Sequence, residues 1–563
     1  MMAEQPLPAL EPDLIDPVTM ADDEPTVRPE HGDTPDCFYA SQAYWKDQLA
    51  LTYHLRTFNT PSVIAAALLE TAPPRGLGEV SVDGAAVFIP ATPTLQLIDC
   101  GITSRTSSPA ATGKGKSYRV GGAAEGTWGG ESVMAERNPR VGDNWAHRYD
   151  CMRFHVPTSF CDFPFMPYGP DLRSPHLLSR DDLAEQVKRY VATFQLNIIT
   201  SAHIQPTHYD QTTQQWQIKL QTPSGQKPAV AKHLVLASGI ASQQRYVPSL
   251  PNQETYQGIN IHSTQYQNAR KLVDQAAKTV LIIGSANTAF DILEDCHAAG
   301  LQITMVVRSL TYIVPIEYLL DKRSLGAYDF GVEAADRLFL SLPSVIDSQL
   351  GDGLMKLFSS QESYRYDALA ATGFPVRDSS HRESVLMHNL LERAGGHYVD
   401  IGGTKLLSKG KAGVKANVEP TGYTATGLQF SDGSTLDADA VVWCTGFADR
   451  HVRDTTASIL GGGAATAPSS NLSDVDKNNT DATAGTTPIL GPDEIAARVD
   501  ATWGVDAEGE IRGMWKRHRL LDNFWIMGGF TQQHRWHSRT LAVQIKAALE
   551  GVLPLAYRDT PRV

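Results

Sequence analysis

The sequence predicts an α/β fold in which parallel strands are joined by crossover helices. The clearest observation is residues 278–314, where two short apolar runs, VLII and ITMVV, flank a segment with helical spacing of apolar residues. A turn of small residues, GSANTA at 284–289, joins the first run to that helix. Residues 130–236 hold a second region of strand candidates around an amphipathic helix. The chain is therefore expected to contain two dinucleotide-binding, Rossmann-like domains.

The turn at 284–289 has the residue types of a pyrophosphate site. Gly284 allows a tight turn, Ala286 leaves room for a phosphate beside the backbone, and Ala289 lets helix and strand pack closely. Asn287 is placed at the helix N-terminus, where unpaired N–H groups and the helix dipole attract phosphate. These four residues are predicted to bind the cofactor.

The second apolar run of this unit ends in a basic residue. Arg308 and Ser309 stand where an NAD site would carry Asp or Glu to bind the ribose hydroxyls. A guanidinium favours the 2′-phosphate of NADP instead. The alternative is an ordinary crossover with a surface arginine.

Composition and charge exclude several classes of protein. Of 563 residues, 42% are hydrophobic and 20% charged, which is ordinary for a globular protein. The net charge of −13 argues against nucleic-acid binding, and no apolar run approaches the length of a membrane span. The N-terminus has neither the basic start nor the apolar core of a signal peptide. The oligomeric state stays open.

Cysteine and histidine usage points to a reducing compartment without a metal site. Six scattered cysteines, none in a CxxC, are typical of free thiols and predict a cytoplasmic location. His534 and His537 have no carboxylate partner at ligand spacing, so no metal is expected.

Several spaced motifs resemble the flavin-containing monooxygenase family. The fingerprint FxGxxxHxxx(Y/F) is matched by Gly258, His262 and Tyr266, with Tyr256 replacing Phe. The turns LASG (236–239) and CTG (444–446), the run RNPRVGDNW (137–145) and the closing MGGFTQQHRWHSRTLAVQI (527–545) occur in the family's order. The segment FHVPTSFCDFPFMPYG (154–169) is similar to plant YUCCA-type indole-3-pyruvate monooxygenases. The resemblance extends well over residues 131–555.

This resemblance implies FAD and NADPH as cofactors. NADPH would reduce FAD, oxygen would add at flavin C4a, and the hydroperoxide would oxygenate a small organic substrate. Glu136 would accept the FAD ribose hydroxyls. The other positions implied to bind the cofactors or line the flavin are Arg137, Asn144, Trp145, Arg148, Gly239, Gly446 and Gly528. His262 and Tyr266 would support the link between the domains. Alternatively, His262 is a structural histidine and Trp145 is plain core. No catalytic residue is assigned.

The chain departs from the family where the FAD phosphate loop should be. A strand, a GxGxxG turn and a helix are expected ahead of Glu136, but the glycine-rich stretches at 113–118 and 121–126 lack the flanking strand, the spacing or the final glycine. The stretch EGTW (125–128) resembles the last strand of a SnoaL-like α+β segment. We infer that the intervening unit is absent and that FAD affinity is severely weakened.

The expected organisation follows from these motifs. Residues 40–70 show helical spacing. The expected parts are a disordered tail at 1–36, a partial SnoaL-like α+β segment at 37–128, an incomplete FAD domain at 129–245 and 405–563 with a flexible insertion at 461–490, and an NADPH domain at 246–404.

Three functions remain open. The first is an FAD- and NADPH-dependent monooxygenase. The second is a catalytically impaired NADPH-binding pseudoenzyme, or an incomplete gene-model product lacking the FAD phosphate loop. The third, a disulfide reductase, is disfavoured by the missing CxxC. The family's catalytic asparagine has no counterpart in 154–169, which favours a decarboxylating reaction over amine oxygenation.

Overall fold

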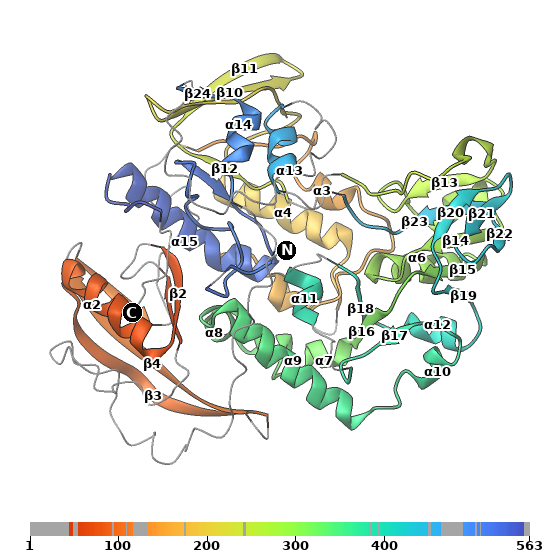
Figure 1. Ribbon diagram of the computed structural model, residues 1–563, viewed down its shortest axis with the longest axis horizontal. Helices are drawn as coiled ribbons and strands as arrows, with labels where there is room; N and C mark the ends of the chain where they lie inside the picture. The colour runs from red at the N-terminus through yellow and green to blue at the C-terminus, as the bar shows by residue number, and fades with distance from the viewer. Residues whose placement is uncertain are drawn as a thin grey trace.

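A computed structural model describes most of the chain, in three parts (Figure 1). The described residues are 44–48, 54–92, 95–107, 110–115, 132–173, 176–239, 244–381, 386–391, 395–448, 452–462, 488–500, 504–506 and 508–556. The expected tail at 1–36 and most of the expected insertion at 461–490 lie outside them. We name the parts the N-terminal unit (44–115), the outer domain (132–239 with 452–556) and the central domain (244–448).

The N-terminal unit is an α+β structure, drawn in red and orange in Figure 1. Strands β1 (Tyr44–Gln48) and β2 (Leu55–Asn59) pair antiparallel, and helix α2 (Pro61–Arg75) follows. Strands β3 (Gly78–Thr92), β4 (Leu95–Ser107) and β5 (Ala110–Gly115) form an antiparallel sheet.

The helical spacing predicted over residues 40–70 is wrong for its first part. Trp45 and Phe58 stack across β1 and β2 with ring centroids 4.9 Å apart, and this cross-strand aromatic pair favours strands over a helix. The helix begins only at Pro61, whose fixed φ suits a first helical turn.

The central domain is built on a five-stranded parallel sheet in the order β13-β23-β14-β15-β19. Its strands are β13 (Ile259–His262), β14 (Thr279–Ile283), β15 (Gln302–Val307), β19 (Gly413–Ala416) and β23 (Ala440–Trp443). Residues 280–283 and all of β23 are buried, as expected of a strand covered on both faces. Helices α5 (Ala269–Asp274) and α6 (Asn287–Ala298) belong to its crossovers.

The expected domain boundary at residue 404 does not coincide with this sheet. Strands β19 and β23 lie beyond residue 404 but pair with β15 and β14. The hairpin strands β20 (Pro420–Tyr423), β21 (Gly427–Phe430) and β22 (Thr435–Asp437) lie between them, with the predicted turn at Asp432 and Gly433. Strand pairing between distant segments sets this boundary, and local sequence patterns do not reveal it.

A largely helical segment is inserted between β15 and β19, shown in green in Figure 1. Its parallel strands are β16 (Thr311–Pro315), β17 (Val376–Arg377) and β18 (His397–Asp400). Its helices are α7 (Ile316–Leu320), η6 (Leu325–Phe330), α8 (Val332–Leu340), α9 (Ser344–Gln361), α10 (Asp367–Ala370), α11 (Leu386–Leu391) and α12 (Thr404–Ser408).

The outer domain contains two separate parallel strand pairs. Strand β6 (Met134–Ala135) pairs with β7 (Ile198–Ile199), and β12 (Leu234–Leu236) pairs with β25 (Phe524–Ile526). A mainly antiparallel sheet precedes β12 and contains β8 (His203–Ile204), β9 (His208–Asp210), β10 (Gln215–Thr222), β11 (Gly225–Ala231) and β24 (Ile489–Leu490).

The helices of the outer domain include a well-capped one at its centre. Ser179 and Asp182 form a capping box at the start of α4 (Arg180–Phe194), as its predicted N-terminus requires. The others are α3 (Asp143–Ala146), η3 (Thr158–Cys161), η4 (Pro170–Leu172), α13 (Val452–Ile459), α14 (Pro492–Ala497) and α15 (Thr531–Leu549), with η5 (Gln253–Thr255) in the central domain.

Buried polar contacts join the parts. Arg535 on α15 forms a bidentate ion pair with Asp336 on α8, with both N···O distances 2.7 Å. Asp291 on α6 accepts hydrogen bonds from the Tyr149 hydroxyl at 2.7 Å and is 3.0 Å from His155 Nε2. The segment 149–155 is thereby attached to the crossover helix of the central domain.

Buried His54 and half-buried His397 are expected to make stability depend on pH. Burial lowers the pKa of His397 and of His54 to about 4, from 6.5. Between pH 4 and pH 6.5 these histidines bind more protons in the unfolded chain than in the folded chain. The stability that the neutral histidines contribute is therefore fully present above pH 6.5 and is lost as the pH falls towards 4. We expect the melting temperature at about pH 5 to lie at least ~2 °C below that at about pH 7. Scanning calorimetry of the wild type and His397→Phe tests this, because the variant should show a shallower decline; identical slopes would contradict the assignment.

No helix among the described residues combines the length and apolarity needed to cross a bilayer. No group of three or more His, Cys, Asp or Glu side chains among those residues is arranged to hold a metal ion.

Candidate nucleotide site

The predicted turn at Gly284 forms a narrow cradle at the carboxyl edge of the central sheet. Gly284 follows β14 with φ +122°, a backbone conformation that side-chain-bearing residues rarely adopt. A Cβ at this position would lie 2.5 Å from the carbonyl oxygen of Cys444, at the end of the neighbouring strand β23. The turn therefore requires glycine, and it exposes backbone where a pyrophosphate could approach.

Helix α6 begins directly after this turn. Ala286 is its N-cap residue and supplies no side-chain cap, so the first N–H groups of a twelve-residue helix are left for another acceptor. The Asn287 side chain is engaged elsewhere, because its Oδ1 accepts a hydrogen bond from the Val399 amide at 2.8 Å. Ala289 is fully buried in the core, as close packing of helix on strand requires.

Arg308 lies beside the turn at the end of the adjacent strand. In the register of β14 and β15, Ile283 pairs with Val306, and the Gly284 amide donates to the Val306 carbonyl at 3.0 Å. The Arg308 side chain is 74% exposed, and its Nη1 is 3.8 Å from Glu419 Oε2. Ser309 is also exposed. Arg308 thus follows the strand that lies beside the Gly284 turn, and its guanidinium has a weak surface partner that a phosphate could replace.

Glu419 is predicted to oppose an anionic ligand at Arg308. Replacing it by Gln removes a negative charge next to the expected phosphate, so Glu419→Gln should tighten NADPH binding by roughly 2- to 5-fold. Isothermal titration at low salt measures this. Glu333→Gln, at an exposed carboxylate on α8, is the control and should change nothing. If Glu419→Gln and the wild type bind NADPH with equal affinity, Arg308 does not contact the ligand.

The fingerprint residues 258, 262 and 266 support this domain from within. Buried His262 lies 3.1 Å from the Gly446 carbonyl through Nε2 and 3.0 Å from Thr264 Oγ1 through Nδ1, and burial lowers its pKa. The Tyr266 hydroxyl donates to Asp295 of α6, and burial raises its pKa. At Gly258, a Cβ would lie 2.6 Å from the Asp439 carbonyl. The contacts of these three residues lie within the central domain, and the predicted support of a link between domains stays a prediction.

The second predicted group of cofactor residues lies in the outer domain. Glu136 follows β6, and its Oε1 accepts a hydrogen bond from the Asn138 amide at 2.7 Å. Arg137 and Asn144 are exposed. Glu136 thus follows strand β6 of the outer domain, and Arg308 follows strand β15 of the central domain.

Trp145 and Arg148 contact one another beside α3. The Arg148 guanidinium carbon lies 5.9 Å from the Trp145 ring centroid, and that ring meets Phe154 edge-on at 5.7 Å. Burial lowers the pKa of Arg148. Trp145 is half-buried and packs against the core, which agrees with the core alternative for this residue.

The three predicted glycines follow strands at the carboxyl edges of the sheets. Gly239 follows β12 with φ +70°, and Gly446 follows β23 with φ +73°. Gly528 follows β25, and a Cβ there would meet Met514 Sδ at 3.0 Å. Because Leu236 pairs with Ile526, Gly239 and Gly528 follow neighbouring strands of one pair.

Two contributors to the site were not predicted from the sequence. The Cys444 carbonyl forms the wall opposite Gly284. The Ser285 hydroxyl is 2.6 Å from Thr311 Oγ1, which ties the cradle to β16. Only a strand pairing over 160 residues apart brings Cys444 there, so no local signal could have found it.

The described thiols are free and held protonated. Cys151, Cys161, Cys296 and Cys444 form no disulfide. Burial raises the pKa of Cys296 to about 12 and raises those of the other three still further. Thiols in this state are poor nucleophiles.

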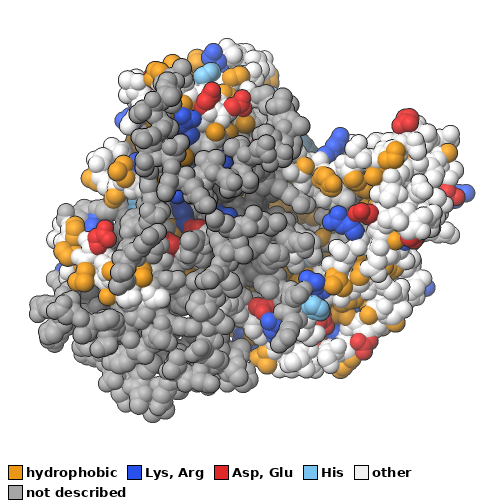
Figure 2. Space-filling view, in the orientation of Figure 1, with side chains coloured by type: hydrophobic (Ala, Val, Ile, Leu, Met, Phe, Trp, Pro, Cys, Tyr) orange, Lys and Arg blue, Asp and Glu red, His pale blue; other side chains and the backbone are white. Residues whose placement is uncertain are grey.

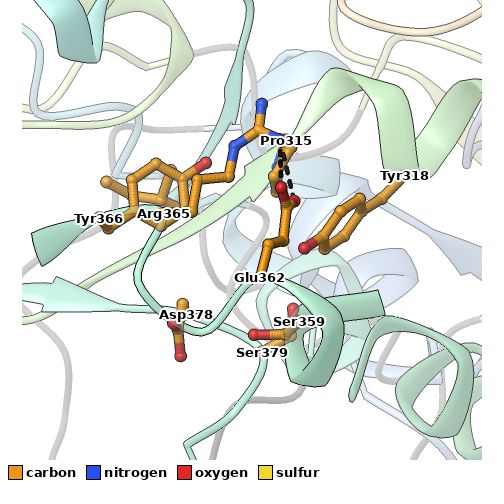
Figure 3. Close-up of a pocket in the computed structure, with 9 residues that line it drawn as sticks. Pro315, Tyr318, Ser359, Glu362, Arg365, Tyr366, Asp378 and Ser379 are labelled. Atoms are coloured by element: carbon orange, nitrogen blue, oxygen red, sulfur yellow. Dashed lines mark hydrogen bonds and ion pairs between the residues drawn. The ribbon is translucent and has the colours of Figure 1, made fainter. Parts of the chain in front are cut away.

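A small pocket in the helical insertion does not belong to this site. It lies between β16, α7 and α9, and its cavity volume of about 10 Å³ has room for about one water molecule. Figure 3 shows Arg365 and Glu362 paired across it, at 2.9 Å. Arg365 also binds Glu317 at 2.8 Å, so its charge is already satisfied. On the face shown in Figure 2, acidic, basic and apolar side chains are interspersed over the central domain, without one dominant charge.

Comparisons with known proteins give the following matches. Residues 136–313 match the family model described as pyridine nucleotide-disulphide oxidoreductase. The chain is 25% identical over 326 residues to the indole-3-pyruvate monooxygenase YUCCA8 of Oryza sativa subsp. indica, covering 57% of this chain and 70% of that protein. It is 23% identical over 336 residues to the indole-3-pyruvate monooxygenase YUCCA1 of Oryza sativa subsp. japonica, covering 60% and 75%. A crystal structure of cyclohexanone monooxygenase with bound ε-caprolactone aligns with a TM-score of 0.48 and 15% identity, covering 76% of this chain and 84% of that one.

Proposed function

Because the chain is a relative of the flavin-containing monooxygenases, we propose that it is an NADPH- and FAD-dependent oxidoreductase of the monooxygenase type. Its substrates would be a small organic molecule and O2. The observation that carries the proposal is the meeting of the Gly284 cradle, the start of α6 and Arg308 at one edge of the central sheet.

The central domain fits NADPH. The cradle that a Cβ would fill and the uncapped start of α6 suit a pyrophosphate, and Arg308 suits the 2′-phosphate. Bound NADPH supplies a hydride. Ala286 and Asn287 would offer backbone amides, while the Asn287 side chain holds β18 against the helix.

The outer domain fits FAD only in part. Glu136, Trp145, Arg148, Gly239 and Gly528 are the residues proposed to contact it. The described residues of this domain include no glycine turn between strand and helix like that of Gly284, so a cradle for the flavin pyrophosphate is not formed by them. The weak flavin binding that we expect rests on the sequence, which carries no GxGxxG turn with flanking strand and helix ahead of Glu136.

This shortfall favours one alternative, an NADPH-binding protein without oxygenase activity. A disulfide reductase is less favoured, because Cys151, Cys161, Cys296 and Cys444 form no disulfide and their pKa values are raised. Among oxygenase substrates we propose a keto acid over an amine, following the plant relatives, which are indole-3-pyruvate monooxygenases. The cytoplasmic location remains a prediction from cysteine usage.

Binding and turnover measured on one preparation of the full chain test the proposal. Titration with NADPH should give saturable binding, tighter than that of NADH. Reconstitution with excess FAD should then support NADPH-dependent oxygen uptake that rises with added keto acid. NADPH binding without any oxygen uptake at saturating FAD would favour the non-catalytic alternative, and absence of NADPH binding would overturn both.

A further inference from the structure

All three parts of the protein meet at the corner between helices α8 and α9 of the helical insertion. Helix α8 ends at Leu340 and α9 begins at Ser344, so residues 340–345 bring together the last carbonyls of one helix and the first amides of the next. The N-cap residue of α9, Pro343, supplies no side-chain cap. The partners of these backbone groups come from the N-terminal unit and from the outer domain.

Strand β1 of the N-terminal unit places two side chains against this corner, beside α8 and α15 in Figure 1. Lys46 and Gln48 are two positions apart on the strand, so they lie on the same face. Lys46 Nζ donates a hydrogen bond to the Leu342 carbonyl at 2.8 Å. Gln48 Nε2 donates to the Leu340 carbonyl at 3.0 Å. Both carbonyls lie at the carboxyl end of α8, where the helix dipole favours a cation.

The same two side chains also bind the outer domain. Lys46 Nζ is 3.1 Å from Glu510 Oε1. Gln48 Oε1 accepts a hydrogen bond from Trp536 Nε1 at 2.7 Å. Trp536 adjoins Arg535, whose ion pair already joins α15 to α8. Lys46 and Gln48 therefore each bridge the central and outer domains.

Glu510 completes the corner from the side of the outer domain. Its Oε2 accepts a hydrogen bond from the Ser344 hydroxyl at 2.9 Å, and its Oε1 accepts one from the Thr57 hydroxyl at 2.7 Å. The Val345 amide, in the first turn of α9, donates to the Gly509 carbonyl at 3.0 Å. A carboxylate at the start of α9 and an ammonium at the end of α8 both complement the helix dipoles.

The Lys46–Glu510 ion pair is shielded from solvent, because the two side chains are only 4% and 2% exposed. Removing one partner of such a pair leaves a buried charge without compensation, which is strongly destabilising. The ammonium also acts on groups of both domains. Burial lowers the pKa of His537 on α15, and Lys46 lowers it further; burial raises the pKa of Asp347 on α9 to about 7, against the opposing effect of Lys46.

We propose that strand β1 is a clamp between the two nucleotide domains, in which Lys46 and Gln48 are positioning residues that fix the orientation of the central domain relative to the outer domain. The clamp acts on α8, α9 and α15 and should leave the Gly284 cradle unchanged. Transfer between groups held by different domains depends on their placement to about 1 Å, so catalysis should depend on the clamp. That consequence rests on the proposed function, whereas the clamp itself does not.

Hydrogen exchange measured on the full chain tests the clamp. In Lys46→Met the Val345 amide should exchange at least ~10-fold faster than in the wild type, while residues 280–283 stay protected. Gln48→Leu leaves no buried charge, so it should fold even if Lys46→Met does not, and it should show the same pattern with a smaller change. Lys356→Met is the matched control, because Lys356 pairs within α9 and should not affect Val345.

A double-mutant cycle tests whether Lys46 and Glu510 act as a pair. Glu510→Gln combined with Lys46→Met removes both buried charges, so the double variant should melt at a higher temperature than Lys46→Met alone. Destabilisation equal to the sum of the two single effects would show that the side chains act independently.

The position of the altered amides decides between a clamp and a local anchor. The Thr57 amide donates to Glu508 at 3.0 Å and reports attachment of the N-terminal unit, whereas the Val345 amide reports contact between the other two parts. Faster exchange at Thr57 with no change at Val345, in both Lys46→Met and Gln48→Leu, would overturn the clamp.

Ligand binding and turnover separate the clamp from the proposed function. The NADPH dissociation constant should be the same in the wild type and in Lys46→Met, while oxygen uptake at saturating FAD should fall at least ~10-fold in the variant. A wild type that neither binds NADPH nor consumes oxygen would contradict the proposed function, and the exchange at Val345 would still decide the clamp. Loss of NADPH affinity in Lys46→Met would show that the effect is not confined to domain orientation and would overturn the positioning role.

Discussion

Replacing Gly284 by Ala is expected to abolish measurable NADPH binding. At φ +122° a non-glycine residue costs on the order of 1–3 kcal/mol, and the new Cβ would lie 2.5 Å from the Cys444 carbonyl oxygen. The turn must shift to relieve this contact, which moves the start of α6 away from the pyrophosphate. Isothermal titration should show affinity reduced by about 100-fold or more.

Gly300→Ala is the matched control for this variant. Gly300, just beyond the other end of α6, has φ +80°, and a Cβ there meets nothing within 4 Å. It incurs the conformational cost without the clash, so it should lower the melting temperature slightly and leave NADPH affinity intact. If both variants lose binding equally, general destabilisation explains the result and the cradle assignment is wrong.

Replacing Arg308 by Ala is expected to remove the preference for NADPH over NADH. A charge-assisted contact with a phosphate contributes about 1.5–3 kcal/mol, so NADPH affinity should fall by roughly 10- to 100-fold while NADH affinity stays constant. The two dissociation constants should be measured at the same salt concentration, because exposed charges are screened.

Arg270→Ala provides the comparison for Arg308. Its side chain is 78% exposed and pairs with Asp274 on α5, so it matches Arg308 in charge and exposure but not in position. It should leave both affinities unchanged. A selectivity for NADPH that survives Arg308→Ala would require another residue to bind the 2′-phosphate.

The parts of the fold that could be predicted are those fixed by local patterns. The β14–α6–β15 crossover was predicted because an apolar strand, a small-residue turn and an amphipathic helix follow one another directly. The sequence offers Ser179 or Asp181 as the cap of α4, and in the structure the Ser179 side chain accepts from the Asp182 amide. The hairpin turn at Asp432 and Gly433 has the residues that such turns require.

The parts that could not be predicted depend on contacts between distant segments. Trp45 and Leu55 belong to a run whose apolar spacing is compatible with a helix, and the stacking of Trp45 on Phe58 across two strands identifies the hairpin. The position of β23 beside β14 depends on pairing with residues some 160 positions earlier. The roles of the nucleotide residues and the domain limits stay predictions, and the variants above test the former.

The attachment of Asp291 has a mechanical consequence. Asp291 lies one turn inside α6, the helix whose first turn faces the expected phosphates, and it is bonded to Tyr149 and His155 of the outer domain. If α6 moves when a ligand binds, either residues 149–155 move with it or the contacts of Asp291 with Tyr149 and His155 are broken. These two buried contacts therefore couple the position of α6 to residues 149–155 of the outer domain.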